Sequence, residues 1–223
     1  MRDRSSRTGS FNVDVVLITA TRNELAVLLT RSASDRERWS LPWRFAQAGE
    51  ALDGLAARTA QDALGEPVSW IEQIGAFGDG RRHPSDTEMS VAFVGLAPHE
   101  TASPRAGFTW FPISDLPPLS PRQRAMVEAA SRVMQARLDQ APIAFRLLPA
   151  TFTLSELQQM YELLLGKRLH KASFRRALQA AWLVEPTDEW RSEGRGRPAQ
   201  LFRYLPKKKR RLHRGVRFDF VNP

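Results

Sequence analysis

Residues 41–65 read LPWRFAQAGEALDGLAARTAQDALG, a loop that leads into an amphipathic helical segment. Two strand-like apolar runs precede this stretch, at 13–18 and 25–29, and a short polar turn joins them. Two more apolar runs follow it, at 70–79 and 90–96, with a polar loop between them. Strand, strand, helix, strand, loop, strand is the element order of an α/β sandwich, so this stretch predicts the helix of such a fold.

The same stretch resembles the box of the Nudix fold, whose pattern is G-x5-E-x7-R-E-U-x-E-E-x-G-U, where U is an aliphatic residue. Glu50, Arg58 and Gly65 fall in register with this pattern, and Arg44 stands in place of the first glycine. Matches of this number in a degenerate pattern would also fit an amphipathic helix of an unrelated fold. The order of the surrounding strands favours the Nudix interpretation.

The acidic positions of the box are largely lost. A Nudix helix aims several carboxylates at Mg²⁺ ions, which neutralise a pyrophosphate and polarise the attacking water. Thr59 and Ala63 replace two of these acids, and only Asp62 keeps a carboxylate, on a side chain one methylene shorter. The sequence therefore predicts a fold that binds nucleoside diphosphates but has no catalytic residues and no metal site, which indicates a sensor.

Positive charge gathers in the C-terminal third of the chain. The 223 residues carry a net charge of +9. Residues 1–145 hold 16 Lys and Arg against 17 Asp and Glu, while residues 146–223 hold 17 against 7. A polyanion is the natural partner of such a region, with nucleic acid ahead of an anionic membrane. The basic run 207–211 alone would also fit a solubilising tail.

Several classes of protein and site are excluded by composition. The chain has no cysteine, which excludes disulfides and thiolate metal sites. No apolar run approaches the roughly 20 residues that cross a bilayer, and the polar, Arg-rich N-terminus lacks the apolar core of a signal peptide. His83, His99, His170 and His213 are scattered singly, without the spacing of a zinc site. We therefore expect a cytoplasmic protein that does not bind membranes.

The C-terminal third has the layout of a winged helix-turn-helix. Thr153 and the glutamate three residues after it form a capping box, which opens a helix that stops at Gly166. A second helix is expected over 172–182, and 143–148 supplies a short helix before both. Residues 183–205 then form a hairpin with an Arg-Gly-Arg tip. Helix, turn, basic helix and hairpin is the arrangement of this DNA-binding fold.

The second helix and the hairpin tip carry the residues expected to contact DNA. Phe174, Ala177, Leu178, Ala181 and Trp182 can face a core, which turns the cationic and amide side chains outward. Such a helix face fits the major groove, and a Gly-flanked arginine loop fits the narrow minor groove. The alternatives are a solvated helix face and a flexible loop. The DNA-binding candidates are Ser155, Lys171, Ser173, Arg175, Arg176, Gln179, Arg195 and Arg197.

The predicted fold class is α/β, with an N-terminal Nudix-like α/β/α sandwich followed by a C-terminal winged helix-turn-helix domain. Residues 121–140 are expected to form a helix whose apolar face docks on a neighbouring domain or a dimer mate. The expected segments are a flexible N-terminus (1–10), a Nudix-like effector-binding domain (11–118), a linker helix (119–141), a winged helix-turn-helix domain (142–206) and a basic tail (207–223).

Together these features resemble the NrtR-type family, the Nudix-related transcriptional regulators of NAD metabolism. The motifs that carry the resemblance are Phe77-Gly78-Asp79, Pro142–Pro149, Phe152–Gln158, Phe174-Arg175-Arg176 and Gly194–Ala199. The resemblance implies a dimeric repressor of NAD synthesis or salvage operons whose Nudix domain binds ADP-ribose or a related metabolite. Ligand binding would change the spacing of the two DNA-reading domains. A related group of regulators responds to NAD and ATP instead.

The chain departs from this family in the loop before the helix. Where relatives carry Leu-Pro-Gly-Gly, it has Leu-Pro-Trp43-Arg44. Two bulky residues should reshape a loop that glycine would let approach a phosphate closely. Arg44 would then supply charge to a phosphate in place of a metal, or Trp43 would fill the pocket.

The candidate ligand contacts follow from charge, aromatic character and nearness to the box. Arginines would bind phosphate and aromatic rings would stack on an adenine, while the alternatives are solvated arginines and core aromatics. Arg58 is interpreted as structural, paired with Glu50 or Asp62. The ligand-binding candidates are Trp39, Trp43, Arg44, Glu50, Phe77, Asp79, Arg81 and Arg82.

Three functions are compatible with these features of the sequence. The first is a homodimeric repressor that binds a double-stranded DNA operator and a small nucleotide effector, with no enzymatic activity and no cofactor besides that effector. The second is an Mg²⁺-dependent Nudix hydrolase of ADP-ribose-like dinucleotides with a DNA-binding appendage. The third is a nonspecific nucleic-acid binder that uses its basic tail. The charge distribution, the predicted wing and the resemblance favour the repressor.

Overall fold

The computed structural model describes residues 11–21, 23–31, 38–78, 83–98, 103–192 and 198–206. The terminal segments predicted to be flexible (1–10) and basic (207–223) lie outside these ranges. The chain forms two compact units. The first extends to Ser131, and the second begins at Arg132.

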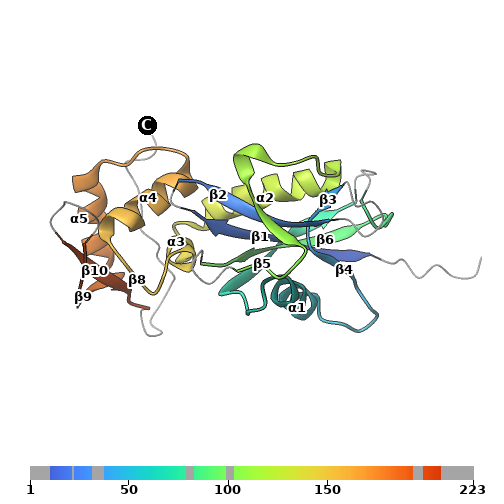
Figure 1. Cartoon of the computed structure of the whole chain (residues 1–223), viewed down its shortest axis with the longest axis horizontal. Coiled ribbons are helices and arrows are strands. Elements are labelled where there is room, and N and C mark those ends of the chain that lie inside the picture. Colours follow the sequence, from blue (N-terminus) through green and yellow to red (C-terminus); the bar gives the residue numbers. More distant parts are fainter. Residues whose placement is uncertain are drawn as a thin grey trace, which may run out of the picture. The chain divides into compact units, whose positions relative to one another are not determined.

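A seven-stranded mixed sheet forms the first unit (Figure 1). Five of the strands follow the order β3-β2-β1-β6-β5. In addition, β4 pairs with β1, and β7 pairs with β2. Its strands are β1 (Asn12–Ala20), β2 (Leu25–Arg31), β3 (Trp39–Ser40), β4 (Trp43–Phe45), β5 (Trp70–Phe77), β6 (Ser90–Leu96) and β7 (Phe108–Pro112). The strands predicted from the four apolar runs are confirmed, whereas the short β3 and β4 were not predicted.

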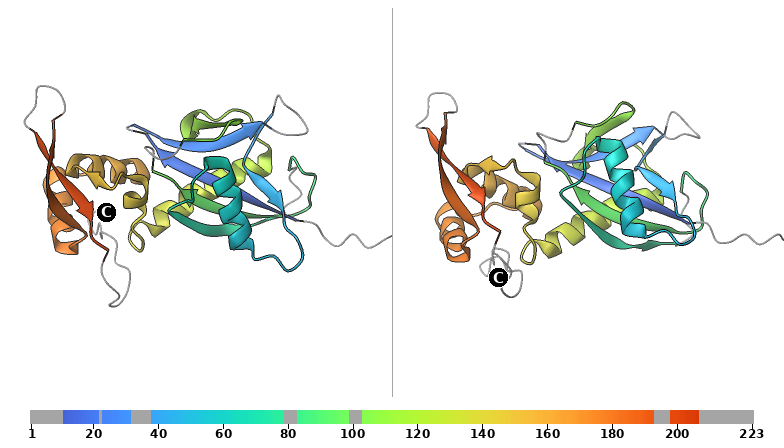
Figure 2. Two further views of the ribbon diagram at one scale, coloured as in Figure 1. Left: turned by 60° about the horizontal axis from the view of Figure 1, so that its bottom comes forward. Right: turned by 90° about the horizontal axis from the view of Figure 1, so that it is seen from below.

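Strand β1 is the centre of this sheet. It pairs in parallel with β6 and antiparallel with β4, and all nine of its residues are buried. Side chains alternate between the two faces of a strand. Val13, Val15 and Leu17 pack in one core cluster with α1 (Leu52–Leu64), while Asp14 points to the opposite face. The first part of α2 (Pro121–Arg137) covers that face, so the sheet lies between two helical layers (Figure 2).

The helix of the Nudix-like box has the predicted position. The retained Gly65 ends α1 in the left-handed conformation, with φ of 84°, and its amide donates to the carbonyl of Gln61. A residue with a side chain would be strained at this φ. A short 3-10 turn, η1 (Ile113–Asp115), follows β7 and leads toward α2.

The second unit is a winged helix-turn-helix. Its three-stranded sheet has the order β8-β10-β9, and the capping box at Thr153 is formed as predicted. Gly166 ends α4 in the left-handed conformation, which also confirms the predicted stop. Its elements are α3 (Ile143–Leu147), β8 (Thr151–Phe152), α4 (Leu154–Leu165), α5 (Lys171–Ala181), β9 (Val184–Arg191) and β10 (Ala199–Tyr204).

The prediction that Trp182 faces the core is wrong. Helix α5 ends at Ala181. Trp182 adopts a left-handed backbone conformation, so its side chain no longer follows the spacing of the helix. Its side chain is therefore 74% exposed. Phe174 and Leu178 are buried as predicted, whereas Ala177 and Ala181 are half-buried.

The turn between α4 and α5 is held by two side chains of α4. Glu162 accepts the Leu169 amide at 2.9 Å and the Gln158 side-chain amide at 2.9 Å. Gln158 also donates to the Leu169 carbonyl at 3.0 Å, so both backbone groups of that residue are satisfied. Burial raises the pKa of Glu162, but these hydrogen bonds and the Arg168 guanidinium outweigh it and hold that pKa below its usual value.

Within the described ranges, no helix combines the length and the hydropathy needed to cross a bilayer.

Replacing Glu162 should loosen the turn between the two helices. Glu162→Ala leaves the Leu169 amide without its acceptor, so the free energy of unfolding should fall by about 1–3 kcal/mol in urea titrations near neutral pH. Because the folded-state pKa is lowered, this contribution is complete above the unfolded value of about 4.3 and is lost as the pH falls through the folded value. Glu189→Ala, at an exposed position of β9, is the control. An equal loss in both variants would contradict the assigned role.

Candidate binding pocket and nucleic-acid interface

A cavity of about 640 Å³ opens beside α1 in the first unit. Its volume lies within the range of ordinary small-molecule sites. The loop before α1 forms one wall, and α1, β2 and β7 contribute the others. The cavity is lined by Thr30, Arg31, Ser40, Leu41, Pro42, Trp43, Arg44, Phe45, Gln47, Glu50, Leu55, Arg58, Thr59, Asp62 and Phe108.

The register of β4 directs Arg44 toward α1. Val13 stands opposite Arg44 in the β1–β4 pairing, so the two side chains share the face that α1 covers. There a guanidinium nitrogen of Arg44 lies 2.6 Å from a carboxylate oxygen of Asp62. The remaining acid of the box is thus paired with a side-chain cation from the neighbouring strand.

The other polar residues of the box are also engaged. Arg58 forms an ion pair with Glu50, which confirms the structural pairing predicted for Arg58. The buried Thr59 donates its hydroxyl to the Leu55 carbonyl at 2.8 Å, and Ala63 is buried against the sheet. Among the residues that the structure describes, no three His, Asp or Glu side chains gather where they could hold a metal. The Mg²⁺ that a Nudix fold implies does not fit this donor set, because divalent cations need clustered free oxygens.

The aromatic candidates lie in different surroundings. Trp43 stands opposite Asp14 in the pairing, on the sheet face away from α1, and its ring meets that of His83 edge-on at 5.4 Å between centroids. Trp39 packs against Phe111 at 4.6 Å, and the Arg31 guanidinium lies 4.0 Å above its ring.

The cavity brings together some of the predicted ligand contacts. Trp43, Arg44 and Glu50 line it, whereas Trp39 and Phe77 do not. The predicted contacts Asp79, Arg81 and Arg82 lie outside the described residues. Arg31 is a cationic lining residue that was not predicted, because it lies at the end of β2, outside the box.

A buried polar cluster lies on the other face of the sheet and was also missed. His83 and Asp14 are fully buried, with His83 Nε2 2.8 Å from Asp14 Oδ1. The amide of Ser85 donates to His83 Nδ1, which assigns a ring hydrogen to Nε2 as the donor to Asp14. The sequence indicated this cluster only through Asp14, a carboxylate within an apolar strand. Its partner His83 lies 69 residues away, so the contact could not be predicted.

The first turn of α2 is hydrogen-bonded to this cluster. Gln123 donates from Nε2 to Asp14 Oδ1 at 3.0 Å and to Ser40 Oγ at 3.1 Å. Arg122, also buried, donates to the carbonyl of Thr87 at 2.8 Å. Ser40 belongs to the cavity wall as well, so the wall and the helix share one hydrogen-bonded group.

Helix α5 presents a cationic face. Lys171, Arg175 and Arg176 are exposed, and none of them forms an ion pair with another residue in the described ranges. Gln179 is exposed beside them, and Ser155 is exposed in the first turn of α4. Ser173 is half-buried, with its hydroxyl 3.4 Å from His170 Nδ1.

Other arginines of this unit have acidic partners. Arg168 pairs with Glu162 at 3.2 Å and Arg191 with Glu156 at 2.7 Å. Arg203 pairs with Glu185. In the part of this unit that the structure describes, the cations of α5 are thus available to an external polyanion. The predicted wing-tip contacts Arg195 and Arg197 lie outside the described residues.

Comparison with known proteins places both units. Residues 144–204 match the NrtR DNA-binding winged helix domain. The crystal structure of Shewanella oneidensis NrtR complexed with a 27mer DNA is 29% identical, with a TM-score of 0.77 over 87% of this chain and 93% of that one. The ADPR responsive transcriptional repressor NtrR of Acinetobacter baylyi is 27% identical over 204 residues, which cover 86% of this chain and 80% of the relative. The Nudix domain of the Shewanella protein, solved with ADP ribose, is 21% identical with a TM-score of 0.50 over 60% of this chain and 94% of that one, and supports the fold.

A Nudix-like sandwich and a DNA-binding winged helix in one chain define a Nudix-related transcriptional regulator. Within that class its second unit carries the NrtR winged helix domain, and the chain as a whole is similar to NrtR-type regulators.

Substituting the buried Gln123 should destabilise the first unit. Gln123→Leu removes one donor from the buried Asp14 carboxylate, and we expect the free energy of unfolding to fall by about 1–3 kcal/mol. Urea unfolding followed by circular dichroism measures the loss. Gln135→Leu changes the same residue type at an exposed position of α2 and should be nearly neutral. A neutral Gln123→Leu would show that the cluster does not hold the helix.

The unpaired arginines of α5 should decide DNA affinity. Arg175→Ala or Arg176→Ala should weaken binding to the preferred site by about 1–3 kcal/mol if the residue pairs with a guanine. Equal loss on preferred and random DNA would instead identify a phosphate contact. Arg203→Ala removes an arginine that is already paired with Glu185, and its effect should be smaller. Fluorescence anisotropy on DNA selected by the wild-type protein gives the comparison.

Proposed function

We propose that the protein represses genes of NAD synthesis or salvage by binding an operator as a homodimer, and that its Nudix domain senses ADP-ribose or a related nucleotide. The observation that carries this proposal is the exposed, unpaired cationic face of α5 within a winged helix of the NrtR type. Such a face fits the major groove of DNA.

Charge supports DNA as the partner of the second unit. Residues 146–223 carry 17 Lys and Arg against 7 Asp and Glu. Several of these arginines neutralise acids within the fold, and the cations of α5 add to a field that attracts phosphates. A relative of similar length has been solved with DNA bound.

The cavity beside α1 supports a nucleotide effector. Arg31, Arg44 and Arg58 line it together with aromatic side chains, which is a suitable lining for phosphate and base. The Acinetobacter relative is described as ADPR responsive, and the Nudix domain of the Shewanella relative was solved with ADP ribose.

The same cavity argues against hydrolysis. The box retains Glu50 and, within the helix, Asp62, and these carboxylates are paired with Arg58 and Arg44. A metal-activated water would need several free carboxylates nearby. We therefore infer a cytoplasmic regulator with no hydrolase activity and no cofactor apart from the effector.

DNA binding with effector titration tests the proposal. Fluorescence anisotropy would compare DNA from upstream of the protein's own gene and of the nearest NAD-synthesis operon with random DNA, while ADP-ribose, NAD and ATP are added in turn. We expect site-specific binding that one of these nucleotides shifts. Weak binding, equal on all DNA and unaffected by every nucleotide, would leave a nonspecific nucleic-acid binder.

An assay of ADP-ribose turnover tests the second candidate function. With Mg²⁺ present we expect no release of AMP above the uncatalysed rate, because the carboxylate cluster is lost. Release of AMP at ordinary enzymatic rates would identify a Nudix hydrolase instead.

A further inference from the structure

We propose that Arg44 takes the place of the divalent cation of a Nudix site, so that the cavity binds a diphosphate group directly and without metal. This inference rests on the proposed nucleotide-sensing function and concerns the same cavity. Its starting point is the disagreement between the donor set of this box and the Mg²⁺ that the fold implies.

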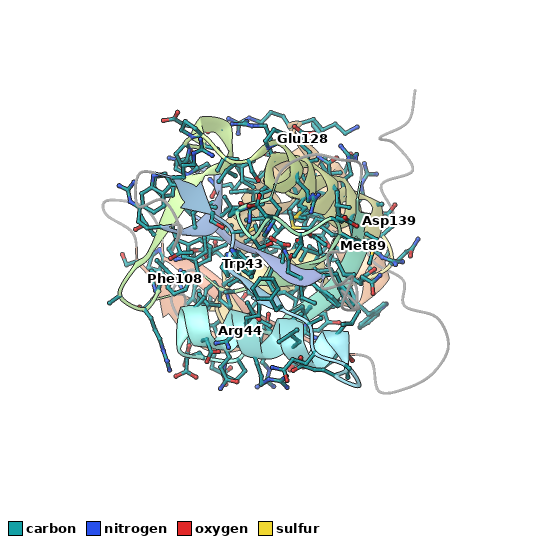
Figure 3. All side chains as sticks on the ribbon, turned by 90° about the vertical axis from the view of Figure 1, so that its right-hand side faces the viewer. Trp43, Arg44, Met89, Phe108, Glu128 and Asp139 are labelled. Carbon is teal, nitrogen blue, oxygen red and sulfur yellow. The ribbon has the colours of Figure 1, made fainter. Side chains whose placement is uncertain are left out.

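The position of Arg44 is the first argument. Strand β4 holds it on the face that α1 covers, and Figure 3 shows its side chain directed toward that helix. Its partner Asp62 belongs to the box position that would ordinarily ligate a metal, and both side chains line the cavity. The positive charge is therefore placed beside the carboxylate that a metal would use.

Accessibility is the second argument. The Arg44 and Asp62 side chains are 54% and 51% exposed, so solvent and solutes reach both partners. An exposed ion pair of this kind contributes only about 0–1 kcal/mol. A diphosphate can accept two parallel hydrogen bonds from a guanidinium, which is a stronger interaction than the exposed pair. Arg44 can therefore leave Asp62 for a ligand at little cost.

The charge of the cavity is the third argument. Its lining holds two carboxylates, those of Glu50 and Asp62. Both carboxylates are engaged by arginines. An arriving cation would find no free carboxylate in the lining, whereas an arriving diphosphate would be attracted to the guanidinium of Arg44. The lining thus selects an anion.

This arrangement reverses the role of Asp62. In a metal-dependent site the carboxylate promotes binding because it holds the cation. Here it competes with the diphosphate for Arg44, so removing its charge should help binding. The two kinds of site therefore predict opposite effects of the same substitution.

Isothermal titration calorimetry of the full chain with ADP-ribose measures these effects. The affinity of the wild-type protein should agree within about twofold between buffers that contain Mg²⁺ and buffers that contain EDTA. Arg44→Ala should weaken binding by about tenfold to a hundredfold, and Arg44→Lys should recover part of the loss because it keeps the charge without the planar fork. Asp62→Asn should strengthen binding about two- to fivefold.

A matched control separates this effect from general changes of charge. Asp53→Asn removes a carboxylate from the exposed first turn of α1, outside the cavity lining, and should leave the affinity unchanged. Unchanged thermal unfolding of the Arg44 and Asp62 variants would show that the fold is intact, as expected for half-exposed side chains.

The possible failures are distinguishable. Binding that requires Mg²⁺, or that Asp62→Asn abolishes in a folded protein, would overturn the inference and leave the nucleotide sensor in place. If ADP-ribose, NAD and ATP bind in neither buffer, the proposed function and this inference fail together.

Discussion

Strand β1 buries Asn12 and Asp14 on one face of the sheet, and much of the first unit is arranged to satisfy these two polar side chains. Buried polar groups without partners are costly, and a buried carboxylate even more so. Asp14 meets this requirement with donors from Asn12, His83 and Gln123. Gln123 lies in the first turn of α2. Its hydrogen bond to Asp14 therefore positions the start of that helix against the sheet. Ser40 joins this arrangement from the cavity side.

The alternation of side chains then explains how two adjacent residues serve different parts of the molecule. Strand β4 is only three residues long, yet its pairing with β1 sends Arg44 toward α1 and Trp43 toward the buried cluster. Figure 3 shows the two side chains apart, with Arg44 beside α1. Arg44 therefore gives the cavity a cation, and Trp43 gives the buried histidine an aromatic neighbour.

Features that depend on neighbouring residues could be predicted from the sequence. The capping box at Thr153 and the stop at Gly166 involve contacts within one turn, and both form as expected. The box helix was found because its spacing is local too. The partner of Arg58 was predicted to be Glu50 or Asp62, because both acids lie close to it in sequence.

Features that depend on contacts between distant segments could not be predicted from the sequence. The two residues of β8 form a strand only because the distant β10 pairs with them. The contact between His83 and Asp14 joins a loop to a strand, so a lone histidine gave no sign of it. Trp182 has the spacing of a core residue, but the chain leaves the helix at that position and carries the ring into solvent.

Helix α5 divides its residues between folding and recognition. Phe174 and Leu178 are its buried residues, and the exposed cations and amide make no ion pairs within the described part of the chain. Substitutions on that outer face leave the core intact, since exposed positions away from such contacts usually change stability by less than about 0.5 kcal/mol. Operator preference can therefore diverge rapidly between related regulators while the fold that presents it is conserved.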